Sequence, residues 1–131
     1  MYRRRIIVVY ILLLSAYVIH IVEETLGNFA AIRVLGSHLL YIVLNGVIVG
    51  VTIALLYCII RRKRSAFYGG IIFAGIMFLN GCAHNVGLII TGRYYGDFAG
   101  SYSGIALLAI GPVLVYYLVK ELRENEETQS V

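Results

Sequence analysis

Four long apolar runs alternate with short polar segments along the chain. The runs cover about residues 6–26, 37–60, 66–91 and 101–119. Because about 20 helical residues cross the roughly 30 Å hydrocarbon layer of a bilayer, each run is typical of a transmembrane helix. A loop or interfacial segment is expected at Gly27 to Gly36, and a polar, partly frayed tail at residues 120–131. We therefore predict an all-α membrane protein in which residues 1–131 form a single four-helix bundle.

The composition supports this interpretation. Of the 131 residues, 60% are apolar and only 14% are charged, and the mean hydropathy is +0.86. A soluble domain is about 45–50% apolar and about a quarter charged. A chain of this length holds one domain. It is therefore too short for a dinucleotide-binding fold, for an α/β-hydrolase sheet, or for a domain built around a phosphate-binding loop. Any chemistry must therefore fit inside a helix bundle.

The basic residues lie at one end of each predicted helix. Three, four and two of the eleven Lys and Arg residues fall within residues 3–5, 61–64 and 120–123. The positive-inside rule places such residues in the cytoplasm, so both termini and the loop at residues 61–65 are predicted to be cytoplasmic. A nucleic-acid surface needs accessible basic residues among polar ones, and we expect no nucleic acid as a partner.

The first apolar run also fits a secretory signal peptide, because a basic segment precedes it. However, no clean small-x-small cleavage site precedes the segment His20–Glu24, and the apolar stretch is long. We therefore expect the first helix to be retained in the membrane.

Small residues are frequent in the predicted helices. Gly46 and Gly50 form a small-xxx-small pair in the second helix, and five glycines make the third helix narrow. Helices associate in lipid where small residues let their backbones approach. We expect these glycines to pack helix against helix, either within the chain or between chains in a homo-oligomer or a larger complex.

Polar side chains inside the membrane are costly, and those of this chain form three stripes. They are His20, Glu23 and Glu24 on the first predicted helix, His38, Tyr41 and Asn45 on the second, and Asn80 and His84 on the third. Residues at this spacing share one face of a helix. Tyr102 and Ser103, at the start of the fourth helix, are near enough to contribute.

The three stripes lie at a common depth. Counted from the cytoplasmic ends of their helices, His20 lies at about 21 Å, and Asn80 and His84 lie at about 21 and 27 Å. His38 begins the second helix at the outer surface, and Asn45 lies about 10 Å below it. All three histidines and the pair of carboxylates therefore meet in the outer half of the bilayer. Such side chains can join helices at about 0.6 kcal/mol per hydrogen bond, but ionisable groups at this depth are more typical of a functional site.

Two imidazoles and a carboxylate are a common set of catalytic zinc ligands, with one position left for water. The same set binds non-haem iron(II), whereas a di-iron bundle needs four carboxylates and two histidines. The predicted ligands of a divalent metal are His20, Glu24 and His84, with zinc expected before iron. Glu23 is the predicted general base, and Asn80 or His38 would stabilise an oxyanion or a substrate head group. Residues expected around the site are His38, Asn45 and Tyr102.

The segment from His20 to Gly27, His-Ile-Val-Glu-Glu-Thr-Leu-Gly, resembles the HXXEE-motif family of small integral membrane proteins, found mostly in bacteria. The resemblance extends to a second histidine, His84, on the third helix. A Tyr-x-Pro-Gly motif opens the last helix of that family; here residues 101–104, Ser-Tyr-Ser-Gly, keep the glycine and lack the proline. The resemblance implies an enzyme of a prokaryotic cytoplasmic membrane, with the motif residues and His84 in its active site, and it names no reaction.

Four functions are compatible with these residues. The first is a metal-dependent enzyme that hydrolyses a lipid or another amphiphile, because the site lies among apolar walls near the outer face. The second is a proton or metal-ion transporter, but the inner half offers only Ser15, Thr52 and tyrosines to continue a polar path. The third is a haem protein with His20 and His84 as axial ligands, which the adjacent glutamates disfavour. The fourth is an accessory membrane subunit without chemistry of its own.

Overall fold

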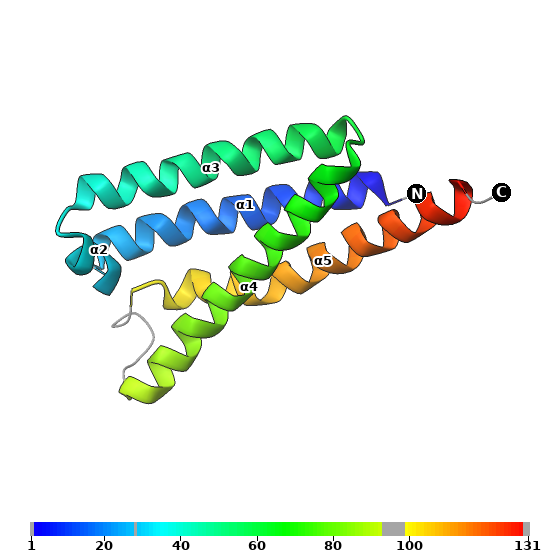
Figure 1. Ribbon diagram of the computed structural model, residues 1–131. Helices are drawn as coiled ribbons and strands as arrows, with labels where there is room; N and C mark the ends of the chain where they lie inside the picture. Colours follow the sequence, from blue (N-terminus) through cyan, green and yellow to red (C-terminus); the bar gives the residue numbers. More distant parts are fainter. Residues whose placement is uncertain (1, 28, 93–98, 130–131) are drawn as a thin grey trace.

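The computed structural model describes residues 2–27, 29–92 and 99–129 (Figure 1). The helices are α1 (Arg3–Leu26), α2 (Ala30–Leu35), α3 (His38–Ile60), α4 (Arg64–Thr91) and α5 (Ser101–Gln129). No β-strand occurs among the described residues. The predicted all-α fold is therefore confirmed.

Four of these helices, α1, α3, α4 and the Ser101–Glu124 part of α5, are long and apolar enough to cross a membrane. A helix satisfies its own backbone hydrogen bonds, which is why a long apolar run adopts this structure in lipid. Both termini and the turn between α3 and α4 lie at one end of the bundle, whereas α2 and the start of α5 lie at the other (Figure 1). The chain is thus an integral membrane protein, and the side that its termini face stays a prediction.

Two polar segments form more helix than we predicted. Residues 30–35 of the expected loop form α2, which Gly36 ends with a left-handed φ of 68°. The expected, partly frayed tail continues α5 to Gln129, because four of residues 120–129 are Glu, which favours helix, and none is Gly or Pro. The other long helices begin within three residues of the predicted positions.

The apolar core lies between α1, α4 and α5. Its buried side chains include Tyr10, Leu13, Phe73, Leu107 and Leu114. α3 packs mainly against α1 and α4, and most of its side chains are exposed on the outside of the bundle. Figure 1 shows α4 crossing the other helices obliquely, so that its far end diverges from α3. Most of the buried side chains therefore come from α1, α4 and α5.

One glycine lies at a close crossing of α4 and α5, whereas two glycines of α3 contact no other helix in the described chain. A Cβ atom added at Gly81 would lie 2.5 Å from Gly104 O, so the backbones of α4 and α5 approach there as small residues permit. Cβ atoms added at Gly46 and Gly50 would meet nothing within 4 Å in the described part of the chain. The packing predicted for this pair of α3 is therefore not found within the described chain.

Candidate metal centre

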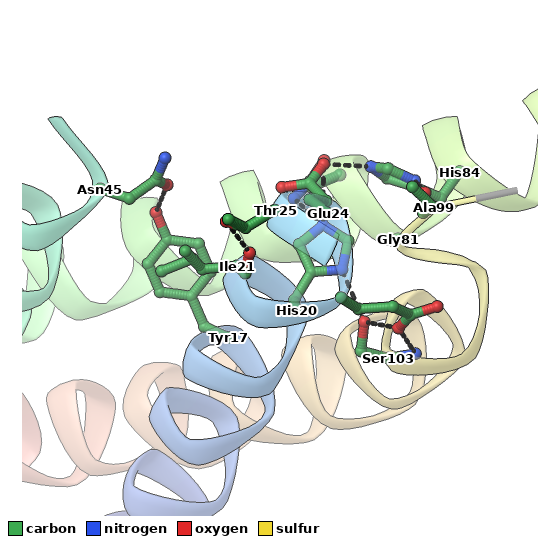
Figure 2. Close-up of polar contacts among 12 residues, drawn as sticks. Tyr17, His20, Ile21, Glu24, Thr25, Asn45, Gly81, His84, Ala99 and Ser103 are labelled. Atoms are coloured by element: carbon green, nitrogen blue, oxygen red, sulfur yellow. Dashed lines mark hydrogen bonds and ion pairs between the residues drawn. The ribbon is translucent and has the colours of Figure 1, made fainter. Parts of the chain in front are cut away.

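Three buried side chains from two helices converge near the end of the bundle that carries α2. His20 and Glu24 lie one turn apart on α1, and His84 lies on α4. These residues, which we call the triad, are 0%, 6% and 2% exposed. Their ligating atoms all lie within 4.8 Å of one another, and Figure 2 shows the Glu24 carboxylate directed at the His84 ring. The triad could therefore hold a metal ion, and it is the set that the sequence predicted.

The distances from Glu24 to the two histidines fit a single ion. Glu24 Oε1 lies 3.0 Å from His84 Nε2 and 3.4 Å from His20 Nε2. Two ligands at about 2.0–2.1 Å from one metal are about 3.4 Å apart at the tetrahedral angle and about 2.9 Å apart at a right angle. Both observed distances match this range.

The orientation of the His84 ring is set by the backbone before α5. His84 Nδ1 lies 2.8 Å from Ala99 O. A carbonyl oxygen only accepts hydrogen bonds, so Nδ1 carries a proton and donates it. Nε2 then faces the Glu24 carboxylate at 3.0 Å. Two acceptors this close need a cation between them, a proton or a metal ion, and an outer N–H bonded to a carbonyl is typical of metal-ligating histidines.

The second carboxylate oxygen of Glu24 is held from α3. Tyr41 is buried, and its hydroxyl donates a hydrogen bond to Glu24 Oε2. Asn45 follows one turn later: its Nδ2 donates to Tyr41 O, and its Oδ1 accepts from Tyr17 OH at 2.7 Å (Figure 2). Tyr41 thus fixes one oxygen of Glu24 while the other faces the histidines, and Asn45 supports Tyr41.

Glu23 binds the start of α5. Its Oε1 accepts from Tyr102 N at 3.2 Å, and its Oε2 accepts from Ser103 N at 3.0 Å and from Ser103 Oγ at 2.5 Å. A carboxylate is stabilised at a helix N-terminus, where backbone N–H groups lack intrahelical partners. Ser103 Oγ also lies 2.8 Å from His20 Nδ1. Glu23 is therefore connected to the triad through Ser103.

The remaining predicted residues differ in how they meet the triad. Asn80 is half-buried on α4, and its Nδ2 lies 3.0 Å from His20 Nε2. His38 is exposed in the first turn of α3 and does not belong to the group of potential ligands. The side chain of Tyr102 is 60% exposed, and its backbone N–H is the part that binds Glu23. The structure thus brings Asn80 to the site and leaves the side chains of His38 and Tyr102 at the surface.

Gly100 and Phe29 pack directly on the imidazoles. Gly100 has a left-handed φ of 84°, and a Cβ added to it would lie 2.6 Å from the His84 ring and 2.7 Å from the His20 ring. Glycine meets both demands because it has no Cβ. The Phe29 and His84 ring centroids lie 4.7 Å apart. Neither residue could be recognised from the sequence, because glycines and aromatic residues are ordinary at the ends of membrane helices.

The fold and the triad define an all-helical membrane protein with a candidate metal centre. Comparisons of the chain with models of protein families, with curated proteins and with solved structures find no match. The resemblance to the HXXEE-motif family therefore stays a hypothesis that rests on the residues themselves.

Proposed function

We propose that this protein is a membrane-embedded, metal-dependent enzyme that hydrolyses a lipid-like substrate at the triad. The observation that carries the proposal is the burial of His20, Glu24 and His84 around one point in a mostly apolar core. Burying such groups is costly unless they are paired or bind a metal. Two imidazoles and a carboxylate suit zinc in preference to iron, and catalytic zinc sites of this kind keep one position open.

The residues around the triad position its ligands or contact the substrate. A divalent metal in the triad would supply a Lewis acid and activate water for hydrolysis. Tyr41 holds one oxygen of Glu24, and Ala99 O holds the His84 ring. The amide of Asn80 lies beside His20 Nε2, where it is placed to donate a hydrogen bond to an oxygen of the substrate as charge develops there.

Glu23 supports the site better as a positioning residue than as a general base. Its carboxylate already accepts hydrogen bonds from Tyr102 N, Ser103 N and Ser103 Oγ, and turning it towards a water at the triad would release them. Those contacts hold the start of α5, so releasing them would also loosen the segment that contacts His20. In the proposed function, Asn80 therefore contacts the substrate, and Glu23 helps to position His20.

An amphiphilic substrate fits the surroundings of Asn80. Ile76 and Leu79, on the same helix, are 54% and 64% exposed. A polar group beside an apolar, lipid-facing surface can bind the head of a lipid whose chains stay in the bilayer. The basic residues at the opposite end favour a site on the outer side, with both termini in the cytoplasm. Together with the family resemblance, this supports a prokaryotic cytoplasmic membrane as the proposed location of the enzyme.

Transport of protons or metal ions is less well supported, because the described interior between the triad and the termini is mostly apolar. Towards the termini the described core is lined by side chains such as Leu13, Phe73, Met77 and Leu114. Proton and ion pathways through membranes use chains of ionisable or polar groups instead. A subunit without chemistry would leave the burial of the triad unexplained.

Hydrolysis of lipid esters by the detergent-purified protein tests the proposal. We expect activity that a chelator removes and that zinc or iron(II) restores. His84→Gln should abolish it, whereas His38→Gln, which changes an exposed histidine, should retain it. Activity that survives both the chelator and His84→Gln would refute metal dependence. A folded protein that binds neither metal would refute the centre itself.

A further inference from the structure

Glu23, Ser103 and His20 form a short chain of hydrogen bonds where α1 meets the start of α5. Ser103 Oγ lies 2.5 Å from Glu23 Oε2. The same oxygen lies 2.8 Å from His20 Nδ1, a contact that Figure 2 shows. Ser103 is 6% exposed and His20 is fully buried. Ser103 and His20 are thus shielded from bulk water, whereas Glu23 is half-buried. The serine hydroxyl contacts a carboxylate and an imidazole at once.

The donors present fix the direction of each hydrogen bond. The backbone N–H groups of Tyr102 and Ser103 can only donate, and they use both oxygens of Glu23 as acceptors. An ionised carboxylate only accepts, so the Ser103 hydroxyl gives its single proton to Glu23 Oε2. The Ser103 oxygen is then left with lone pairs, which accept from His20 Nδ1.

We infer that Glu23 and Ser103 are positioning residues that hold His20 in the tautomer with its proton on Nδ1. Nε2 is then the nitrogen with the free lone pair, and it lies 3.4 Å from Glu24 Oε1 and 3.0 Å from Asn80 Nδ2. The amide N–H of Asn80 donates to that lone pair in the metal-free protein. Nε2 is also the atom that a metal ion in the triad would bind. The effect of the tautomer on metal binding therefore rests on the proposed function.

The same segment sets the second imidazole by another route. Ala99 O accepts from His84 Nδ1 at 2.8 Å, so both histidines present Nε2 to the same oxygen of Glu24. Both partners of the Nδ1 atoms lie within residues 99–103. Docking of this segment on Glu23 therefore prepares the two nitrogen ligands together, as outer partners of metal-bound histidines do.

Nitrogen-15 NMR of the imidazoles tests the tautomer in chelator-treated protein, in alkaline buffer that keeps the rings neutral. The His20 signals are assigned by their loss in His20→Gln. We expect a protonated Nδ1 and an unprotonated Nε2 in the wild type. Ser103→Ala removes the acceptor, so His20 should shift towards a proton on Nε2, where Glu24 can accept it. Ser103→Thr keeps the hydroxyl and should restore the wild-type signals.

Two further variants separate this role from a merely structural one. Glu23→Ala removes the acceptor of the Ser103 proton, which is then free for His20 Nδ1, so His20 should shift towards a proton on Nε2. Thr52→Val removes a buried hydroxyl that bonds within α3, and it should leave the His20 signals unchanged. A residue that only held α5 in place would not reverse the tautomer.

Titration with Zn²⁺ distinguishes failure of this inference from failure of the proposed function. Ser103→Ala should weaken zinc binding by about 10- to 100-fold, and Ser103→Thr and Thr52→Val should change it little. A wild-type His20 with its proton on Nε2, or a tautomer that stays unchanged in both Ser103→Ala and Glu23→Ala, would overturn the inference even if zinc binds. The expected tautomer in a wild-type protein that binds neither zinc nor iron(II) would support the inference and overturn the proposed function.

Discussion

Replacing Gly100 with alanine should disturb both histidines of the triad at once. The added Cβ would lie 2.6 Å from His84 Nδ1 and Cε1 and 2.7 Å from His20 Cε1, which is too close for carbon atoms that are not bonded. The rings cannot both retreat freely, because Ala99 O and Ser103 Oγ hold their Nδ1 atoms. The left-handed φ of 84° adds a backbone cost. Alanine at this position should therefore destabilise the fold and the metal centre together.

Gly36→Ala is a matched control that separates the two costs. Gly36 also has a left-handed φ, of 68°, but a Cβ added there meets no described atom within 4 Å. The backbone cost of about 1–2 kcal/mol is shared by both variants, whereas overpacking against the imidazoles costs about 1–3 kcal/mol more. The free energy of unfolding should fall by about 1–2 kcal/mol in Gly36→Ala and by about 2–5 kcal/mol in Gly100→Ala.

Reversible unfolding of the detergent-purified protein in SDS, followed by circular dichroism, measures both free energies. Titration with Zn²⁺ then reports on the site. Gly100→Ala should weaken zinc binding by about tenfold or more, and Gly36→Ala should leave it unchanged. Equal losses of stability in the two variants, with equal affinities for zinc, would refute the reasoning that Gly100 packs on both imidazoles.

Three further substitutions test other contacts of the site and the fold. Tyr41→Phe removes the hydroxyl that donates to Glu24 Oε2, so zinc affinity should fall by about tenfold in the same titration while the circular dichroism spectrum stays unchanged. Asn80→Ala should lower kcat for lipid hydrolysis by about 100-fold and leave zinc bound; loss of zinc with the activity would contradict a role in substrate binding. Gly81→Leu should lower the free energy of unfolding by about 1–3 kcal/mol, because a Cβ there meets the α5 backbone at 2.5 Å, whereas one at Gly75 meets no described atom within 4 Å. Equal losses in Gly81→Leu and Gly75→Leu would contradict the close crossing of α4 and α5.

The membrane helices could be predicted because a bilayer leaves an apolar chain few alternatives. Backbone groups in lipid need partners within their own segment, so a long apolar run becomes a helix. His20 and Glu24 could be paired because they are four positions apart on one helix. His84 was added by its depth alone, and this succeeded because α1 and α4 both begin at the end of the bundle where the termini lie (Figure 1).

The rotation of each helix about its axis could not be predicted from the sequence. His38 and Tyr41 share a stripe of α3, yet Tyr41 is buried against Glu24 whereas His38, at the helix end, is exposed. Glu23 and Glu24 are adjacent, but neighbouring helical residues point about 100° apart. Glu23 therefore meets α5 while Glu24 meets α3 and α4, and only the packed bundle shows which helix lies on which side.

The roles of Gly100 and Ser103 depend on contacts between distant parts of the chain. Ser103 meets His20 at a separation of 83 positions, and no periodicity within one helix connects the two. In the sequence, both residues are ordinary for the start of a helix, where Gly and Ser are common. Gly100 and Ser103 reach the imidazoles only because the start of α5 packs against Glu23, and this tertiary contact cannot be derived from the sequence pattern.

X-ray absorption of the zinc-loaded protein tests the central claim most directly. The wild type should show two imidazole ligands, with nitrogen and oxygen atoms at about 2.0–2.2 Å. Glu24→Gln should lose the metal, whereas Glu121→Gln, which changes a buried carboxylate near the N-terminus, should keep the same spectrum. Sulfur ligands at about 2.3 Å, from Cys58 or Cys82, or a metal that remains bound in Glu24→Gln, would contradict the account.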